Sequence, residues 1–161
     1  RIVLYTGISG GALCGLRWQD IDFKNGFIML DAEFAKNNKT KSVPINSDVL
    51  EILAALPRTS DFVFPGKNGG KRTDFRRIAR RVRDNAGLPK DFRPLHGLRH
   101  NFASRIASSG KVDLYTLQKM LTHKSPIMTQ RYAHLSDEAM KRAALVSQEV
   151  MKINEENEEE K

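Results

Sequence analysis

Glycine and proline divide this chain into short segments, and this division constrains the fold more than any other sequence feature. Gly7, Gly87 and Gly110 each follow an apolar segment, and glycine just past a helix favours its termination. Pro57 ends another apolar segment, whereas Pro126 lies where a first helical turn is expected. The sequence therefore predicts several short helices rather than a few long ones.

Residues 19–46 have a different pattern, with short apolar runs separated by turn signals. Asn25-Gly26 marks one tight turn, and Asn37-Asn38 marks another between the runs FIML and KSVPI. We therefore expect strands here. The predicted fold class is mainly α with a small antiparallel β-sheet near the N-terminus (α+β).

Polar residues suggest where three of the helices begin. Ser47 is expected to cap a helix over residues 48–57, and Ser136 to cap one over 137–153. Thr73 or Asp74 would cap the arginine-rich segment FRRIARRVRDNAG. Three apolar side chains at helical spacing would form the buried stripe of that segment: Phe75, Ile78 and Val82.

The charge of the chain points to a polyanionic partner. The 161 residues carry a formal net charge of +8, and the last eight, NEENEEEK, include five Glu and one Lys. The preceding part therefore carries +12, which favours nucleic acid as partner, although ordinary solubility charge is the alternative.

No apolar run is long enough to span a membrane. The single cysteine, Cys14, excludes an internal disulfide and fits a reducing, cytoplasmic compartment.

Basic side chains give candidates for DNA contact. The segment FRRIARRVRDNAG is either a phosphate-contacting face or a solvated helix of good helix formers. The candidates are Arg76, Arg77 and Arg80 in this segment, and Lys39 and Lys41 in the predicted hairpin.

The histidines allow a metal hypothesis and a phosphate hypothesis. His96 and His100, at i and i+4, could chelate zinc, but no HExxH pattern, cysteine pair or nearby carboxylate completes a site. Phosphoryl transfer instead needs a nucleophile, cations on the phosphate oxygens and an acid for the leaving group. Tyr132, Arg99 and His123, with His96 and a lysine, have the required residue types.

Four segments, in order, resemble the catalytic domain of the tyrosine recombinases of the phage integrase type. LHGLRHNFAS resembles the His-x-x-Arg box, and LQKMLTHKSPIMTQRYAHL the closing segment with its nucleophilic tyrosine. KNNKTKSVPI resembles the hairpin with the catalytic lysine, and TGISGGALCGLRWQDID the opening box. The resemblance covers residues 2 to 150.

The resemblance implies a role for each matched residue. Tyr132 would attack DNA and form a 3′-phosphotyrosyl link, while Arg99 would hold the scissile phosphate. His96 would assist proton transfer, His123 would bond a nonbridging oxygen, and Lys36 would protonate the leaving 5′ oxygen. No metal and no cofactor are implied, because the phosphodiester energy is kept in the tyrosyl bond.

The opening box departs from the family pattern Thr-Gly-x-Arg-x-x-Glu at two positions. Ser9 replaces the first catalytic arginine, and Ala12 replaces the acidic residue that supports it. Positions i and i+3 share a helix face, so the two family residues pair, and losing both is milder for folding than losing one. Removing one preorganised donor costs about 10²–10³ in rate, so we expect impaired strand transfer.

The resemblance also implies an organisation and partners. Residues 1–153 would form the catalytic domain and 154–161 an acidic tail, with the N-terminal edge and a core-binding domain missing. Expected partners are double-stranded DNA and other protomers in a DNA-bound tetramer, in a bacterial or phage-encoded cytoplasmic protein. The final helix, with Met140, Ala144 and Val150, would dock on a neighbouring subunit or pack on its own core.

The alternatives belong to two other classes of protein. A DNA-binding regulator could keep the scaffold without the reaction, and a covalent adduct at Tyr132 would separate the two. A metal-dependent nuclease ranks last, because acidic ligands are absent from the pattern.

Overall fold

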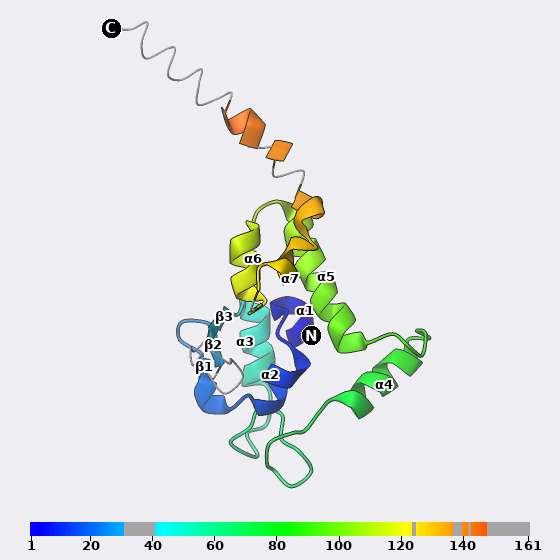
Figure 1. Cartoon of the computed structure of the whole chain (residues 1–161). Coiled ribbons are helices and arrows are strands. Elements are labelled where there is room, and N and C mark those ends of the chain that lie inside the picture. Colours follow the sequence, from blue (N-terminus) through cyan, green and yellow to red (C-terminus); the bar gives the residue numbers. More distant parts are fainter. Residues whose placement is uncertain (31–40, 124, 137–139, 142, 148–161) are drawn as a thin grey trace, which may run out of the picture.

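The computed structural model describes residues 1–30, 41–123, 125–136, 140–141 and 143–147 (Figure 1). Its helices are α1 (Ile2–Thr6), α2 (Gly10–Gly15), η1 (Trp18–Asp20), α3 (Ser47–Ala54), α4 (Arg76–Asn85), α5 (Pro94–Ser109), α6 (Leu114–Met120), α7 (Ile127–Gln130) and η3 (Ala133–Ser136). Its strands are β1 (Ile21–Asp22), β2 (Phe27–Leu30) and β3 (Lys41–Pro44). The predicted fold class is confirmed. In the described residues, no helix is both long enough and apolar enough to cross a membrane.

The three strands form one antiparallel sheet in the order β1-β2-β3. The predicted Asn25-Gly26 turn is confirmed: Gly26 has φ +71°, and Asp22 accepts a hydrogen bond from the Asn25 backbone N–H. In the β2–β3 register, Ile28 pairs with Val43, and both side chains are fully buried. The second predicted turn, at Asn37-Asn38, lies outside the described residues.

Two clusters of buried apolar residues form the interior. The first joins α1–α3 to the inner face of the sheet, with Ile8, Leu16 and Leu53 among its members. The second lies between α5, α6 and the chain after α7, and Tyr132 belongs to it. Figure 1 shows α1 beside α5, between the sheet side and the α6–α7 side of the molecule.

Gly7 makes the close packing of α1 and α5 possible. It ends α1 in the left-handed conformation, with φ +66°. A Cβ at this position would lie 2.6 Å from a Phe102 ring carbon and 2.8 Å from a Leu121 methyl carbon. A residue without a Cβ is therefore required by both the backbone conformation and the space available.

The helix ends follow the predictions in part. Gly110 ends α5 with φ +58°, as predicted, and Pro126 precedes the first turn of α7. The cap of α3 is wrong by one residue, because the Asn46 side chain accepts from the Val49 backbone N–H at 3.1 Å. The cap of α4 is also wrong: Phe75 is the N-cap, and Asp74 accepts from the Arg76 N–H.

The predicted buried stripe of α4 is wrong as well. Ile78 is 41% exposed and Val82 is 53% exposed, and only Phe75 packs inward, edge-on against Phe64. In Figure 1, α4 lies apart from the body and approaches it mainly at the start of α5. The spacing predicted the amphipathic pattern of this helix, but Ile78 and Val82 pack against neither core cluster.

The described part of the final predicted helix is helical at 140–141 and 143–147. Met140 is 74% exposed, and Ala144 is also exposed, so neither residue packs on the core of this chain. Ser136, the predicted cap, is the last residue of η3, and residues 137–139, where the predicted helix would begin, lie outside the described residues. Val150 lies outside the described residues.

Candidate active site

Tyr132 is a buried residue, with 5% of its surface exposed, just after α7. Its ring belongs to the second core cluster, so packing fixes the position of the phenol. The hydroxyl oxygen lies 2.5 Å from Nδ1 of His100 on α5. Burial raises the pKa of Tyr132, while Arg131 and Arg99 act in the opposite direction. The hydroxyl is therefore protonated at neutral pH and needs a base to become a nucleophile.

Arg99 ties three parts of the site together from the middle of α5. Its guanidinium donates hydrogen bonds to the carbonyl oxygens of Gly7, at the end of α1, and Leu121, at the end of α6. Burial lowers the pKa of Arg99, and Tyr132 raises it, but an arginine stays charged in either case. Its remaining N–H groups are available for an anion.

His96 and His100 lie one turn apart on α5 and contact each other. Their Nε2 atoms are 2.7 Å apart, and the rings meet edge-on at 89°. His96 is exposed, whereas His100 is partly covered. Burial lowers the pKa of His100, and His96, Arg131 and Arg99 lower it further, so this imidazole is neutral at pH 7.

His123 follows α6 and faces the same group of charges. Its Nδ1 lies 2.8 Å from the hydroxyl of Thr129, a residue of α7 that is 2% exposed. Burial lowers the pKa of His123 to about 4, with further lowering by Arg99, Arg131, His100 and Lys41. The preceding residue, Thr122, has φ +54°, which turns the chain out of α6 at this point.

Of the three lysines singled out in the hairpin, Lys41 is described. It lies at the start of β3 and donates a hydrogen bond from Nζ to the Thr122 carbonyl at 2.8 Å. With His123 it lines a cavity of about 350 Å³ between the sheet and α6. This bond links the sheet to the chain beside His123. Lys36 and Lys39 lie outside the described residues.

Ser9 and Ala12 form an ordinary helix cap. Ser9 is the N-cap of α2, and its Oγ accepts a hydrogen bond from the Ala12 backbone N–H at 3.2 Å. Ser9 is exposed and carries no charge toward the site. The start of α2 is thus capped without the ion pair that the resemblance implies at these two positions.

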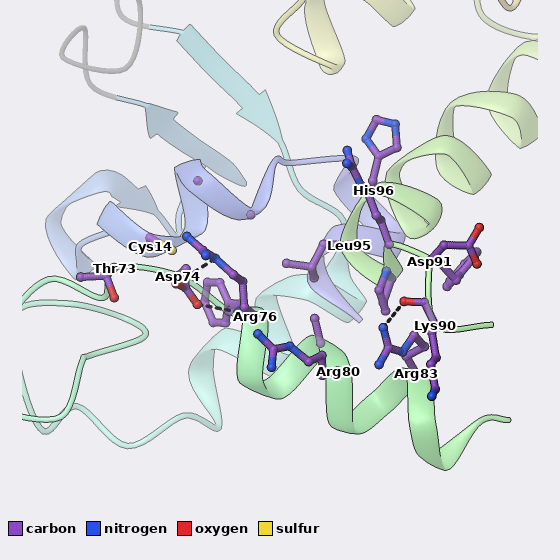
Figure 2. A pocket seen from close by; sticks show the side chains of 17 residues that line it. Cys14, Thr73, Asp74, Arg76, Arg80, Arg83, Lys90, Asp91, Leu95 and His96 are labelled. Atoms are coloured by element: carbon purple, nitrogen blue, oxygen red, sulfur yellow. Dashed lines mark hydrogen bonds and ion pairs between the residues drawn. The ribbon is translucent and has the colours of Figure 1, made fainter. Parts of the chain in front are cut away.

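A cavity of about 690 Å³ lies between α2, α4 and the start of α5, and His96 lies at its edge (Figure 2). Arg76, Arg80 and Arg83 of α4 line one side. Arg76 pairs with Asp74 at 3.2 Å, and Arg83 pairs with Asp84 at 2.8 Å. Arg77 is exposed and does not line this cavity.

The lining of this cavity combines apolar residues with its basic side. The apolar lining residues include Cys14, Phe75, Ala79, Phe92 and Leu95. Gly10 and Gly11, which follow Ser9 in α2, complete the wall opposite α4. The residues beside Ser9 and two of the three candidate DNA-contact arginines, Arg76 and Arg80, thus line one cavity.

The structure brings Tyr132, Arg99, His96 and His123 to one region around α5. From the sequence, His100 is only a possible metal ligand with His96. Its contact with the Tyr132 hydroxyl was not predicted, and neither was the partner of His123, Thr129. The position of His100 directly after Arg99 and one turn after His96 was the available signal.

The comparisons with known proteins identify the family of this chain. The profile of the phage integrase family matches residues 1–139. Tyrosine recombinase XerC of Xanthomonas axonopodis pv. citri is 36% identical over 138 residues, covering 81% of this chain and 43% of the relative. A tyrosine recombinase of Thermosipho africanus is 33% identical over 144 residues, covering 85% of this chain and 48% of the relative. The chain thus spans less than half the length of these curated relatives.

Solved structures show the same fold. The crystal structure of XerA recombinase superimposes with a TM-score of 0.67 at 28% identity, covering 90% of this chain and 55% of that one. The catalytic domain of bacteriophage HP1 integrase gives a TM-score of 0.64 at 27% identity, covering 89% of this chain and 77% of that one. XerH recombinase bound to its difH substrate, in a pre-cleavage complex, gives a TM-score of 0.69 at 25% identity, covering 86% of this chain and 42% of that one.

Proposed function

Since this chain belongs to the phage integrase family, we propose that it is the catalytic part of a site-specific tyrosine recombinase. Its substrate would be double-stranded DNA, as in the XerH complex with difH. The observation that supports this most directly is the contact of a buried tyrosine hydroxyl with a histidine pair on the helix that also carries Arg99. We further propose that residues 1–153 act as the catalytic unit.

In the proposed reaction, the Tyr132 oxygen attacks the scissile phosphorus and the bond to the 5′ oxygen breaks. The products are a 3′-phosphotyrosyl link and a free 5′ hydroxyl. Arg99 would stabilise the charge that develops on the phosphate oxygens, and His123 would bond a nonbridging oxygen. The low pKa of His123 means that it would do so as a neutral N–H donor. Lys36 would donate the proton to the leaving oxygen.

We propose that DNA lies along the face formed by α4 and the cavity beside it. Arg76, Arg77 and Arg80 are exposed on α4, and two of them line the same cavity as His96. Lys41 would contact DNA near the hairpin, although its Nζ already bonds the Thr122 carbonyl. Lys39 is a further candidate. The exposed apolar residues of the final helix, such as Met140, would serve contacts between protomers of a DNA-bound tetramer.

Catalysis by this chain is expected to be impaired, because Ser9 replaces a guanidinium with a helix cap. The test measures covalent adduct formation on a library of nicked duplexes, which trap the phosphotyrosyl intermediate. The double variant Ser9→Arg, Ala12→Glu should react about 10²–10³ times faster than the natural chain. Tyr132→Phe in either background should give no adduct, which controls for attachment elsewhere.

The outcomes distinguish the proposals. Equal rates for the natural chain and the double variant would contradict the impairment. No adduct from either, with DNA binding retained, would favour the second candidate, a DNA-binding regulator on this scaffold. That candidate is supported by the helix cap at Ser9, which completes the start of α2 without a charged pair.

A further inference from the structure

Two hydrogen bonds connect the Tyr132 hydroxyl to the protein surface. The hydroxyl oxygen lies 2.5 Å from Nδ1 of His100, and the other ring nitrogen of His100 lies 2.7 Å from Nε2 of His96. His96 is exposed at the edge of the large cavity. A proton on the buried phenol therefore has a continuous path through two imidazoles to an exposed ring.

The surroundings of His100 favour its neutral form. The charged and titratable groups that face it are His96 and Arg99 on α5, Arg131 after α7, His123 after α6, and Tyr132 itself. Burial, His96 and the two arginines all lower the pKa of His100. A neutral imidazole has one protonated and one bare nitrogen, so His100 can accept a proton on one side and donate one on the other.

We propose that His100 is a catalytic residue that takes the Tyr132 proton through Nδ1 and passes its Nε2 proton to His96. This inference rests on the proposed recombinase function. As the phenol oxygen bonds to phosphorus, its proton moves to Nδ1 of His100, and the proton on Nε2 moves to Nε2 of His96. The bond from phosphorus to the 5′ oxygen breaks, and that oxygen takes a proton from Lys36. His96 then releases a proton to water.

The same pair serves the rejoining step in reverse. After cleavage, His100 carries its proton on Nδ1, which faces the tyrosyl oxygen. When a 5′ hydroxyl attacks the phosphotyrosyl link, it gives its proton to the neutral amine of Lys36, and the departing phenol oxygen takes the Nδ1 proton of His100. His96 returns a proton to Nε2 of His100 and recovers one from water. Both neutral proton arrangements of the pair are therefore used, one before cleavage and one after it.

This assignment separates His100 from His96. Because His100 occupies the contact with the phenol, His96 reaches the phenol through His100. A purely structural His100 would orient the ring of Tyr132 without carrying its proton. A glutamine side chain can keep the hydrogen bond to the hydroxyl but cannot act as a base at neutral pH, so His100→Gln distinguishes the two roles.

The experiment uses the full chain with Ser9→Arg and Ala12→Glu, and the nicked duplex that reacts best with it. Adduct formation is compared on this duplex and on one with sulfur in place of the 5′ bridging oxygen. A thiolate leaves without protonation, so the sulfur duplex should rescue Lys36→Ala. His100→Gln should be about 10²-fold slower than its parent on both duplexes. His134→Gln, at an exposed histidine after Tyr132, should match the parent.

Each result has a definite meaning. Two results would overturn the proton relay from Tyr132 through His100 to His96 while leaving the recombinase function in place. One is an adduct rate of His100→Gln within about threefold of the parent, and the other is full rescue of His100→Gln by the sulfur duplex. If the parent forms no adduct on any duplex, the proposed function fails and the relay fails with it. Should His100→Gln misfold, as judged by thermal unfolding and DNA binding, His100→Ala decides instead: added imidazole should restore much of its adduct rate, and no recovery would overturn the relay.

Discussion

At the scale of single residues, Tyr132 combines a packing role with the proposed chemical one. Its ring is enclosed by the cluster that contains Phe102, Leu117 and Leu121, while its hydroxyl emerges toward His100. A core position removes rotamer freedom before the reaction, which favours attack from one direction. The same burial raises the pKa of the phenol, so in the proposed reaction Tyr132 needs its histidine partner as a base.

Ser9 stands where the resemblance implies a catalytic arginine, and it forms a helix cap instead. Its side chain accepts from Ala12 N–H, and a serine N-cap of this kind stabilises a helix by about 1 kcal/mol. Gly10, which follows, lies against Leu95 of α5, so α2 keeps its contact with the helix that carries the site. We therefore expect catalysis and stability to be separable at this position.

His123 leads to a prediction about the pH dependence of stability. Its pKa is about 4 in the folded chain, against 6.5 for an unperturbed histidine. The unfolded chain therefore binds a proton between these pH values that the folded chain does not. Stability should fall as the pH falls from about 6.5 to about 4, and His123→Gln should weaken this dependence. Urea unfolding of the natural chain and of the variant, at pH 7 and at about pH 4.5, measures this difference in stability.

Both the natural chain and His123→Gln keep His100, whose pKa is also lowered in the folded state. Part of the pH dependence of stability should therefore persist in the variant. An equal loss of unfolding free energy in natural chain and variant would show that His123 is not held neutral by its surroundings.

At the scale of elements, α5 organises the site. It carries His96, Arg99 and His100 on adjacent turns, and Arg99 reaches the ends of both α1 and α6. The elements are short, so their ends lie near the middle of α5, where carbonyl groups without helical partners accept from the guanidinium. The site is thus formed by helix ends meeting around one longer helix.

The junction of α1 with α5 gives a prediction about stability. Gly7→Ala introduces a Cβ at φ +66°, 2.6 Å from the Phe102 ring. Backbone strain and the clash together should lower the free energy of unfolding by about 3 kcal/mol. Gly87→Ala is the matched control, since Gly87 also has φ +63° but no neighbouring atom within 4 Å. It should cost only about 1 kcal/mol.

Chemical unfolding of both variants measures these costs. If Gly7→Ala and Gly87→Ala lose the same stability, the close approach of Phe102 is not maintained in solution. Because the Gly7 carbonyl also accepts from Arg99, the Gly7 variant should form adduct more slowly as well.

At the scale of the whole molecule, the distribution of charge matters more than its total. The chain has 27 Lys and Arg against 19 Asp and Glu, and several of the arginines lie on α4 beside the large cavity. This helix lies at the periphery in Figure 1. Four of its arginines are exposed: Arg76, Arg77, Arg80 and Arg81. Such a position suits a helix that follows a polyanion rather than one that supports the core.

Two arginine variants test whether the position of a charge matters, because each lowers the net charge of the chain by one. Arg80 lines the cavity, whereas Arg105 is exposed on α5, about 180° around the helix from His96 by α-helical geometry. DNA affinity should fall steeply with salt for the natural chain, and Arg80→Ala should reduce the slope of log K against log salt by about one. Arg105→Ala should leave the slope unchanged. Equal effects of the two variants would argue against α4 as the DNA face.

The sequence by itself determined the fold class, the positions of most helices and the family, because these depend on local signals. Gly110 and the Asn25-Gly26 turn act through backbone conformation at their own positions, and apolar spacing reports which side of a helix is suited to burial. These signals failed where the outcome depends on distant neighbours: Ile78 and Val82 are exposed because α4 contacts little besides the start of α5.

Only the tertiary structure decided which groups meet. Tyr132 and His100 are 32 residues apart, and Arg99 is 92 residues from the Gly7 carbonyl that it binds. No local pattern specifies contacts between residues so far apart in the sequence, because these contacts follow from how α1, α6 and the chain after α7 pack on α5. The residue types of the site are thus written in the sequence, whereas the partner of the phenol is a product of packing.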